Sequence, residues 1–368
     1  MKVALVYDRV NKWGGAERVL LALKELFPDA TLFTSVFNSE TAGWANVFTI
    51  QTSFLQHVPF AKSHHEAFAS LMPIAFETFS FDEYDVVISL TSEAAKGVIT
   101  KPATVHICLC LTPTRYLWSG HDEYFENPFL KFVAMPVLWY LRQWDIIAAN
   151  RPDKFLAISK EVQTRIKKYY KKEADVLYPP LLLHDANTPS IGSGYFLVVS
   201  RLIPIKKIDI AIKACNTLQV PLKIIGTGSQ ETYLKSIAGP TISFLGSLTD
   251  SQVVGYYKGC TALLFPGIED FGLTILEANA FGKPVIAFQG GGALETVVSG
   301  KTGEFFPKQT ESSLTEVMQD LLERKKITLL QTEQTQYKNA CIQNAKKFTM
   351  KKFEQSLHKS IASVKKYL

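Results

Sequence analysis

Cysteine is scarce in this sequence of 368 residues, and its pattern excludes two common kinds of site. The five cysteines are odd in number, and they lack the paired Cys/His spacing of a zinc site. The sequence therefore predicts reduced thiols, a cytoplasmic location and no structural metal. The residues are Cys108, Cys110, Cys215, Cys260 and Cys341.

An uninterrupted apolar run long enough to span a bilayer is also missing. The most apolar long stretch covers residues 129–149, and charged residues and a proline break it too often for a lipid span. We expect a core or interfacial helix there. The chain begins with "MKVALVYDRV", which lacks the charged and then apolar regions of an export signal. The interruptions of the apolar stretch are Lys131, Pro136, Arg142 and Asp145.

Acidic residues are too few to balance the basic ones, and the net charge is +6. The excess lies mainly in residues 165–172, 346–353 and 363–368. Such clusters are either solvated helix faces or surfaces that meet anionic lipid. No RNA-binding or zinc-finger motif accompanies them, so the sequence predicts no nucleic-acid partner.

What is present is the pattern of a folded α/β protein, 47% hydrophobic and 20% charged. The length suggests two domains, at a prior of ~150 residues each. Buried strand patterns alternate with helical ones such as residues 16–28 in the first half, which is typical of βαβ units with a parallel sheet. The predicted strands there are 3–7, 30–37, 85–90, 105–111, 154–159 and 174–180.

The same pattern restarts after a stretch rich in Asn, Pro, Ser and Gly. We predict an N-terminal domain over 1–182, a linker over 183–194, a C-terminal domain over 195–345, and a helix over 346–368 that can cross back to the first domain. The expected fold is two Rossmann-like lobes facing across a cleft, with ligands at the carboxyl ends of the strands. The second set of predicted strands is 195–200, 222–226, 242–246, 262–266 and 284–288.

Three glycine-bearing loops follow predicted strands. Gly14 and Gly15 open a helix, where free N–H groups and the positive helix end can hold a phosphate, although the pair is equally typical of a simple entry turn. The loops at 226–229 and 289–295 repeat the arrangement. The G-x-G at 226–228 has no third glycine, which disfavours a dinucleotide-binding site.

Two cations follow the first strand of the second domain. Arg201 and Lys206 lie five residues apart. Such a pair can neutralise a diphosphate leaving group, Arg through a bidentate fork and Lys as a point charge. The alternative is a pair of ordinary surface cations.

The stretch "IEDFGLTILEANAFGKP", 268–284, holds two glutamates eight residues apart. Glu269 is expected in a loop and Glu277 about one turn inside a helix that starts near Thr274. The N–H groups of Phe271, Gly272 and Leu273 then lie at the helix N-terminus. Two carboxylates flanking an anion-binding helix end suit a ligand with hydroxyls and phosphate, such as a nucleotide sugar. The alternative is a helix-start charge and a solvated face.

This region, "FPGIEDFGLTILEANAFGKPVIAFQGGGALETVVSGKTGEFF", resembles the E-x7-E region of retaining glycosyltransferases of the GT-B fold, family 4, which includes many bacterial mannosyltransferases. The stretches "MKVALVYDRVNKWGGAERVL", "LMPIAFETF", "YDVVISL", "AISKEVQTRIKKYY", "DVLYPP" and "SRLIPIKKIDIAI" resemble landmarks of that family in the same order. The resemblance spans nearly the whole chain.

The resemblance implies that the N-terminal domain binds the acceptor and the C-terminal domain binds the nucleotide sugar. It also implies a role for each matching residue. Arg201 and Lys206 would bind the diphosphate and stabilise its charge as it leaves, and Glu269 would hydrogen-bond the transferred hexose. Glu277 would hold the ribose. The remaining donor-binding residues would be Gly14, Gly15, Phe271, Gly272 and Leu273.

The implied reaction moves a hexose, with GDP-mannose favoured as donor, to a glycan or lipid-linked glycan during polysaccharide biosynthesis. The anomeric configuration would be retained by front-face attack assisted by the leaving phosphate. No cofactor and no metal would be required, because cations and helix ends take the place of a metal ion.

One position departs from the family pattern. Many relatives carry a histidine before the Thr-Pro at 112–113, and Leu111 stands there in this chain. Donor preference and turnover are therefore open. Arg115 and Tyr116 are candidate acceptor-side residues. The apolar and basic segments at 53–76 and 129–149 would let the enzyme work peripherally on the inner face of a membrane.

Three other functions compete with hexosyl transfer. A noncatalytic nucleotide-sugar or glycan-binding protein would bind nucleotide without transfer, and the change at Leu111 fits it. An epimerase would need acid/base carboxylates aimed at a sugar carbon, and the sequence offers no strong candidates. An NAD-dependent dehydrogenase is disfavoured by the incomplete glycine fingerprint.

Overall fold

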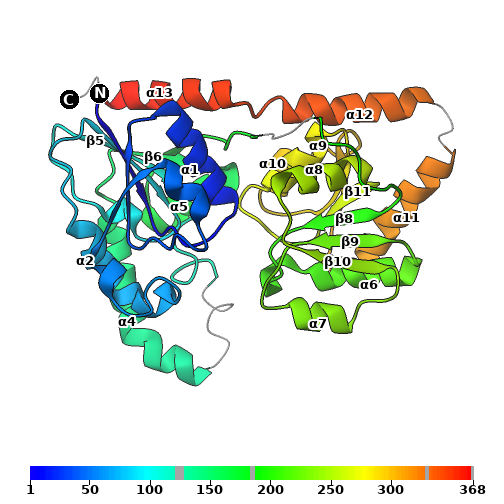
Figure 1. Ribbon diagram of the computed structural model, residues 1–368, viewed down its shortest axis with the longest axis horizontal. Coiled ribbons are helices and arrows are strands. Elements are labelled where there is room, and N and C mark those ends of the chain that lie inside the picture. Colours follow the sequence, from blue (N-terminus) through cyan, green and yellow to red (C-terminus); the bar gives the residue numbers. More distant parts are fainter. Residues whose placement is uncertain (121–127, 183–186, 328–330, 366–368) are drawn as a thin grey trace. The chain divides into compact units, whose positions relative to one another are not determined.

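The computed structural model describes residues 1–120, 128–182, 187–327 and 331–365. It divides into two compact units, the first comprising Met1–Pro180 and Met350–Leu368 and the second Leu181–Thr349 (Figure 1). The domain boundaries at 182 and 346 and the linker over 183–194 stay predictions. None of the described helices is long and apolar enough to cross a membrane.

Unit 1 is built on a seven-stranded parallel sheet in the order β3-β2-β1-β4-β5-β6-β7. The strands are β1 (Val3–Tyr7), β2 (Thr31–Thr34), β3 (Thr49–Thr52), β4 (Val86–Thr91), β5 (Val105–Cys110), β6 (Lys154–Ala157) and β7 (Ala174–Val176). The helices are α1 (Gly15–Leu26), α2 (Met72–Glu77), α4 (Pro128–Ala148), α5 (Lys160–Tyr170) and α13 (Met350–Lys365), with 3-10 turns η1 (Gly43–Val47), η2 (Phe54–His57), η3 (His65–Leu71) and η4 (Ala95–Gly97).

Unit 2 is built on a six-stranded parallel sheet in the order β10-β9-β8-β11-β12-β13. The strands are β8 (Phe196–Val199), β9 (Leu222–Ile225), β10 (Ile242–Gly246), β11 (Ala262–Phe265), β12 (Val285–Phe288) and β13 (Gly303–Phe306). The helices are α6 (Ile208–Leu218), α7 (Glu231–Ser236), α8 (Asp250–Gly259), α9 (Leu273–Ala280), α10 (Ala293–Thr296), α11 (Glu311–Ile327) and α12 (Gln331–Ala345), with η5 (Pro204–Lys206).

Alternating residues of each strand feed two apolar cores, one on each face of the unit 2 sheet. Phe196 and Val198 of β8 pack with residues of α6 and α11, whereas Leu197 packs with residues of α8 and α9. Figure 1 shows these helix pairs on opposite sides of the sheet. The predicted fold class, two Rossmann-like α/β domains, is confirmed.

Two strands were missing from the sequence-based prediction. β3 is a short edge strand, TIQT, whose residues are exposed or half-buried, so it has no apolar run. β13, GEFF, begins with a glycine and is only four residues long. The apolar stretch 129–149 forms the helix α4, as expected.

The C-terminal helix α13 belongs to unit 1. Its His358 ring meets Phe27 edge-on, and Ser363 accepts a hydrogen bond from Lys154 of β6. The last helical segment of the chain is therefore part of the first domain by its contacts.

Candidate functional site

The segment with the two glutamates follows β11 and leads into α9. Gly272 has φ +88°, a left-handed conformation that favours glycine, and the helix begins at the next residue, Leu273. Glu269 thus lies in the loop and Glu277 in the second turn of the helix. The backbone N–H groups at 271–273 lie at the positive end of α9.

Lys206 and Glu269 meet in unit 2 although 63 residues separate them in the chain (269 minus 206). The Lys206 Nζ lies 2.5 Å from Glu269 Oε1, and both side chains are largely shielded from solvent. Gly267 permits this approach, because a Cβ there would lie 2.9 Å from the Cα of Lys206. A cation from the β8 loop and a carboxylate from the β11 loop are therefore held in one place.

Arg201 lies in the same β8 loop and is exposed. A backbone hydrogen bond joins the β8 loop to the neighbouring loop of residues 226–229: Leu202 N donates to the carbonyl of Thr227 at 2.9 Å. A side chain at Gly226 would overlap the carbonyl of Ser200, and one at Gly228 the carbonyl of Leu202. The close contact with the β8 loop therefore requires glycine at both positions, which the sequence alone does not reveal.

The glycine loop after β12 packs on the glutamate loop in the same manner. Gly292 N donates to the carbonyl of Glu269 at 2.8 Å, and a Cβ at Gly292 would overlap the Phe271 backbone. Gly291 has φ +57°, and its own Cβ would lie 2.5 Å from the Glu269 carbonyl. The backbone around Glu269 is thereby set by two neighbouring loops.

Glu277 is oriented by a residue that sequence reasoning missed. The Tyr257 hydroxyl, on α8, donates to Glu277 Oε2 at 2.7 Å, and the Tyr257 ring stacks on Phe281. Tyr257 is 1% exposed. A buried tyrosine hydroxyl needs a hydrogen-bond partner. That need is the one property of Tyr257 that could have linked it to Glu277.

Phe271 contributes backbone and packing. Its side chain is buried and meets Phe348 edge-on. A donor-binding role for Phe271, as predicted, can therefore involve only its main chain. Leu273, the first residue of α9, is half-buried.

Gly14 and Gly15 belong to unit 1, at the start of α1. Gly14 is extended, with φ 177°, so its backbone does not require glycine. Its missing side chain leaves room for Glu17, whose Oε2 would lie 3.1 Å from a Cβ at Gly14. Glu17 is buried and accepts from the Tyr7 hydroxyl at 2.5 Å.

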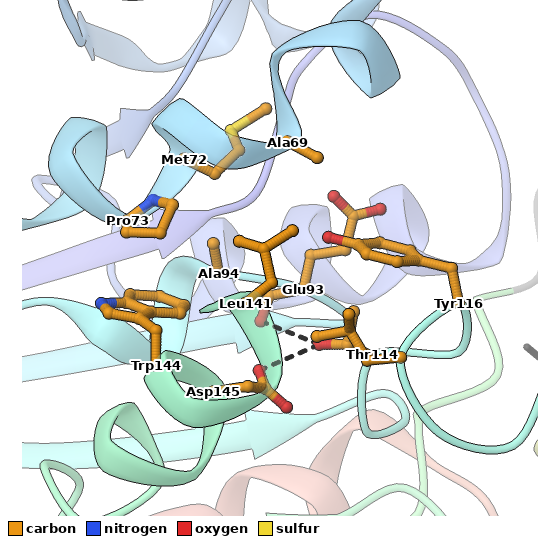
Figure 2. A pocket seen from close by; sticks show the side chains of 11 residues that line it. Ala69, Met72, Pro73, Glu93, Ala94, Thr114, Tyr116, Leu141, Trp144 and Asp145 are labelled. Atoms are coloured by element: carbon orange, nitrogen blue, oxygen red, sulfur yellow. Dashed lines mark hydrogen bonds between the residues drawn. The ribbon is translucent and has the colours of Figure 1, made fainter. Parts of the chain in front are cut away.

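Tyr116, a predicted acceptor-side residue, lines a pocket in unit 1 that α4, the start of α2 and the loop after β4 also line. Figure 2 shows its ring beside the carboxylate of Glu93 at one end of the pocket. Burial, and then the negative charge of Glu93, raises the pKa of Tyr116 well above its usual value. Arg115 is the adjacent residue and is not among those lining the pocket.

The two carboxylates of this pocket differ in their partners. Arg9 Nη1 lies 2.5 Å from Glu93 Oε1. Asp145 is buried and accepts from Lys96, Thr114 and Trp118 at 2.5, 3.1 and 2.7 Å. Asp145 thus fastens α4 to the unit, and Glu93 is the carboxylate nearer to Tyr116 (Figure 2). Leu111 N donates to the carbonyl of Thr91 at the adjacent strand ends.

No group of three His, Cys, Asp or Glu side chains suited to a metal ion occurs within residues 1–120, 128–182, 187–327 and 331–365. The described site offers cations, carboxylates and a helix N-terminus. Such a set can bind a ligand that carries both phosphate and hydroxyl groups.

Comparison with known proteins agrees with this chemistry. Residues 184–348 match the family model "Glycosyl transferases group 1". The match covers less than half of the chain, and this segment is similar to that family. It contains Arg201, Lys206, Glu269 and Glu277, and also the newly found Tyr257.

Two curated relatives align with parts of the chain. The O-antigen chain mannosyltransferase C of Escherichia coli is 27% identical over 50% of this chain and 52% of its own length. A GDP-mannose-dependent phosphatidylinositol monomannoside mannosyltransferase of Mycolicibacterium smegmatis is 30% identical over 34% of this chain and 37% of its own. The chain thus spans about half, or less, of the length of these relatives.

A solved structure matches the entire fold. The Anabaena protein Alr3699/HepE, in complex with UDP, superimposes with a TM-score of 0.71 at 20% identity, covering 99% of this chain and 100% of its own. At that identity the likeness concerns the fold alone, two Rossmann-like α/β units.

Proposed function

We propose that the protein is a retaining hexosyltransferase that moves mannose from GDP-mannose to a glycan or lipid-linked glycan. The observation that carries the proposal is the pairing of Lys206 with Glu269 beside the N-terminus of α9, within the segment similar to the group 1 glycosyl transferases. The mannosyltransferase names of two relatives support the sugar. The UDP in the Anabaena structure makes a uridine donor the main competitor.

Lys206 and Glu269 form an ion pair in this structure. A bound donor would exchange this contact for two others: Lys206, with Arg201, would hold the diphosphate, and Glu269 would accept from hexose hydroxyls. Held there, the two cations would stabilise the negative charge that develops on the leaving diphosphate.

Glu277 would bind the ribose. A carboxylate can accept several hydrogen bonds, so the contact with Tyr257 is compatible with acceptance from ribose hydroxyls. Gly14 and Gly15 of unit 1 would approach the diphosphate, and Arg115 and Tyr116 would lie on the acceptor side.

In the proposed step the bond between the anomeric carbon and the diphosphate oxygen breaks. A bond to the acceptor hydroxyl forms on the same face, and the hydroxyl proton passes to the leaving diphosphate. Arg201 and Lys206 would supply the charge that a metal ion supplies elsewhere, so the proposal includes neither a metal nor another cofactor. We place the enzyme in the cytoplasm and at the inner surface of a membrane.

Calorimetry with GDP, UDP, ADP and their sugars tests the donor, using the wild type and Glu277→Ala. Binding of one nucleotide that Glu277→Ala loses would support the donor site, and a transfer assay with that sugar series follows. If no nucleotide binds to the folded protein, the proposal is wrong.

A noncatalytic binding protein is the second candidate, favoured by Leu111 at the position where the family resemblance leads us to expect histidine. It predicts nucleotide-sugar binding without transfer or donor hydrolysis. Leu111→His would then be the informative variant, because a gain of turnover would assign the loss of activity to this position.

A further inference from the structure

The helix α4 of unit 1 exposes an apolar face. We define its outward face by Phe132, Val133, Met135, Trp139, Tyr140 and Ile147, all of which are exposed. Phe132 and Trp139 are 71% and 67% exposed, values that are unusual for large aromatic residues. A contiguous apolar surface of this kind marks an interaction site.

Within residues 132–148, the charged residues of α4 are turned away from this face. They are Arg142 and Asp145. Arg142 Nε donates to the carbonyl of Leu117 at 2.8 Å, and Asp145 is buried and accepts hydrogen bonds from neighbouring side chains of unit 1. The polar groups therefore fasten the helix to unit 1 and leave an outward face without charge.

The opposite side of α4 is fully engaged by its own unit. Leu138 and Leu141 pack with Leu117 in a small core. Trp144 fits against Gly97, where a Cβ would overlap its ring, and its Nε1 donates to Glu77 at 2.8 Å. The outward face is thus presented by a firmly held helix.

Unit 1 exposes other apolar side chains as well. Ile74 is exposed on α2, next to Pro73, which lines the same pocket as Leu141 and Trp144 of α4. Figure 1 shows α2 beside α4 in unit 1. Phe60, in the turn before η3, is 77% exposed with φ +65°, and an exposed lysine, Lys62, follows it.

A basic helix end adjoins α4 through stacked aromatic rings. Arg142 lies over the Trp118 ring, Trp118 stacks on Tyr169 of α5, and Lys168 Nζ lies 5.2 Å from the centre of the Tyr169 ring. The end of α5 continues with an exposed Lys171. The apolar face therefore has a positively charged neighbour.

We propose that the outward face of α4 inserts into the interfacial region of an anionic lipid bilayer, with the basic end of α5 against the headgroups. Tryptophan and tyrosine favour that region, and lysines near the surface add attraction to anionic lipid. A second copy of the chain would instead bring two basic flanks of like charge together. This inference deepens the membrane part of the proposed function and does not depend on sugar transfer.

Flotation with vesicles tests the proposal. Full-length protein would be mixed with phosphatidylcholine vesicles with and without phosphatidylglycerol. The wild type is expected to float with the anionic vesicles. The double variant Trp139→Asp/Ile147→Asp should bind them at least about tenfold more weakly, because two large apolar side chains are no longer there to be buried in the bilayer. Tyr233→Asp, at an exposed tyrosine of α7, is the matched control and should bind as the wild type does.

The basic flank has its own variant. Lys168→Gln/Lys171→Gln should weaken binding to anionic vesicles by about fivefold for each lysine and leave weak binding to neutral vesicles unchanged. Quenching by brominated lipid should fall in Trp139→Phe relative to the wild type, since Trp139 would be a buried reporter.

Two results would overturn the inference. One is equal vesicle binding by wild type and Trp139→Asp/Ile147→Asp. The other is a wild type that does not bind vesicles and is a dimer by light scattering, while the double variant is a monomer. That result would assign the face to contact with a second copy of the chain. Nucleotide binding by calorimetry, measured on the same samples, separates failure of this inference from failure of the donor site.

Discussion

The hydroxyl of Tyr257 donates a hydrogen bond to one oxygen of Glu277. Tyr257→Phe removes this hydrogen bond while keeping the ring that stacks on Phe281. Hydrogen bonds to charged groups contribute ~1.5–3 kcal/mol, so we expect the nucleotide Kd to rise by about tenfold or more. Calorimetry measures the change, and Tyr233→Phe on the exposed face of α7 serves as the control. Unchanged affinity would show that Glu277 does not need Tyr257 for binding.

Lys206 gives a second prediction at the residue scale. Lys206→Ala leaves Glu269 without this ion pair and removes a charge that we propose binds the diphosphate. We expect the preference for nucleoside diphosphate over monophosphate to shrink, because the lost contact concerns the distal phosphate. The neighbouring Lys207 is exposed and supplies a matched control, Lys207→Ala. An unchanged preference in Lys206→Ala would remove Lys206 from the diphosphate site.

At the scale of elements, the loops around Glu269 depend on glycines that allow backbones to touch. Gly292→Ala would force a Cβ into the backbone of Phe271, which should lower the free energy of unfolding by ~1–3 kcal/mol and weaken nucleotide binding. Gly43→Ala is the control, since nothing lies within 4 Å of a Cβ there. Urea denaturation measures the free energy of unfolding of both variants, and calorimetry measures their nucleotide binding. Equal stability of the two variants would mean that the loops shift to accommodate the added Cβ without a loss in the free energy of unfolding.

Sequence reasoning identified these elements better than it identified their contacts. The start of α9, after Gly272, was predicted to within one residue, because an apolar helical pattern follows a permissive glycine. The short β3 and β13 were missed, since four residues carry too little periodicity. The glycines of 226–228 suggested phosphate binding, whereas a backbone contact with the β8 loop, distant in sequence, also requires them.

The same limit applies to the candidate site. Lys206 and Glu269 were each proposed from local pattern, but their 2.5 Å contact depends on the β8–β11 neighbourhood in the sheet. Tyr257 lies on a helix with no motif of its own, and only its burial beside Glu277 gives it a role. The roles of Gly14, Gly15, Arg201 and the acceptor-side residues stay predictions.

At the scale of the whole molecule, the two units differ in how acid should affect them. Unit 1 contains two histidines whose pKa values are strongly lowered. Burial lowers the pKa of His106 to about 3 and that of His65 to about 4. His106 is fully buried, and its Nε2 lies 2.8 Å from the Ser89 hydroxyl. No histidine occurs among the described residues of unit 2, 187–327 and 331–349.

The sign follows from proton uptake. Between pH about 6.5 and 4, the unfolded chain protonates both histidines and folded unit 1 does not, so its stability is full above about 6.5 and falls as the pH drops. Asp8 acts in the opposite sense, because burial raises its pKa and its protonation favours the folded state as the pH falls. A comparison of wild type with a histidine variant cancels the Asp8 effect.

We therefore expect acidification to destabilise unit 1 selectively. Between pH 6.5 and 4 the wild type should lose stability more steeply than His106→Gln, by about 1 kcal/mol per pH unit, while the exposed His358→Gln should keep the wild-type slope. Calorimetric unfolding across this range measures the slopes, and added nucleotide identifies the unit 2 transition if it binds there. Equal slopes for wild type and His106→Gln would mean that His106 becomes charged within the folded core, which its complete burial argues against.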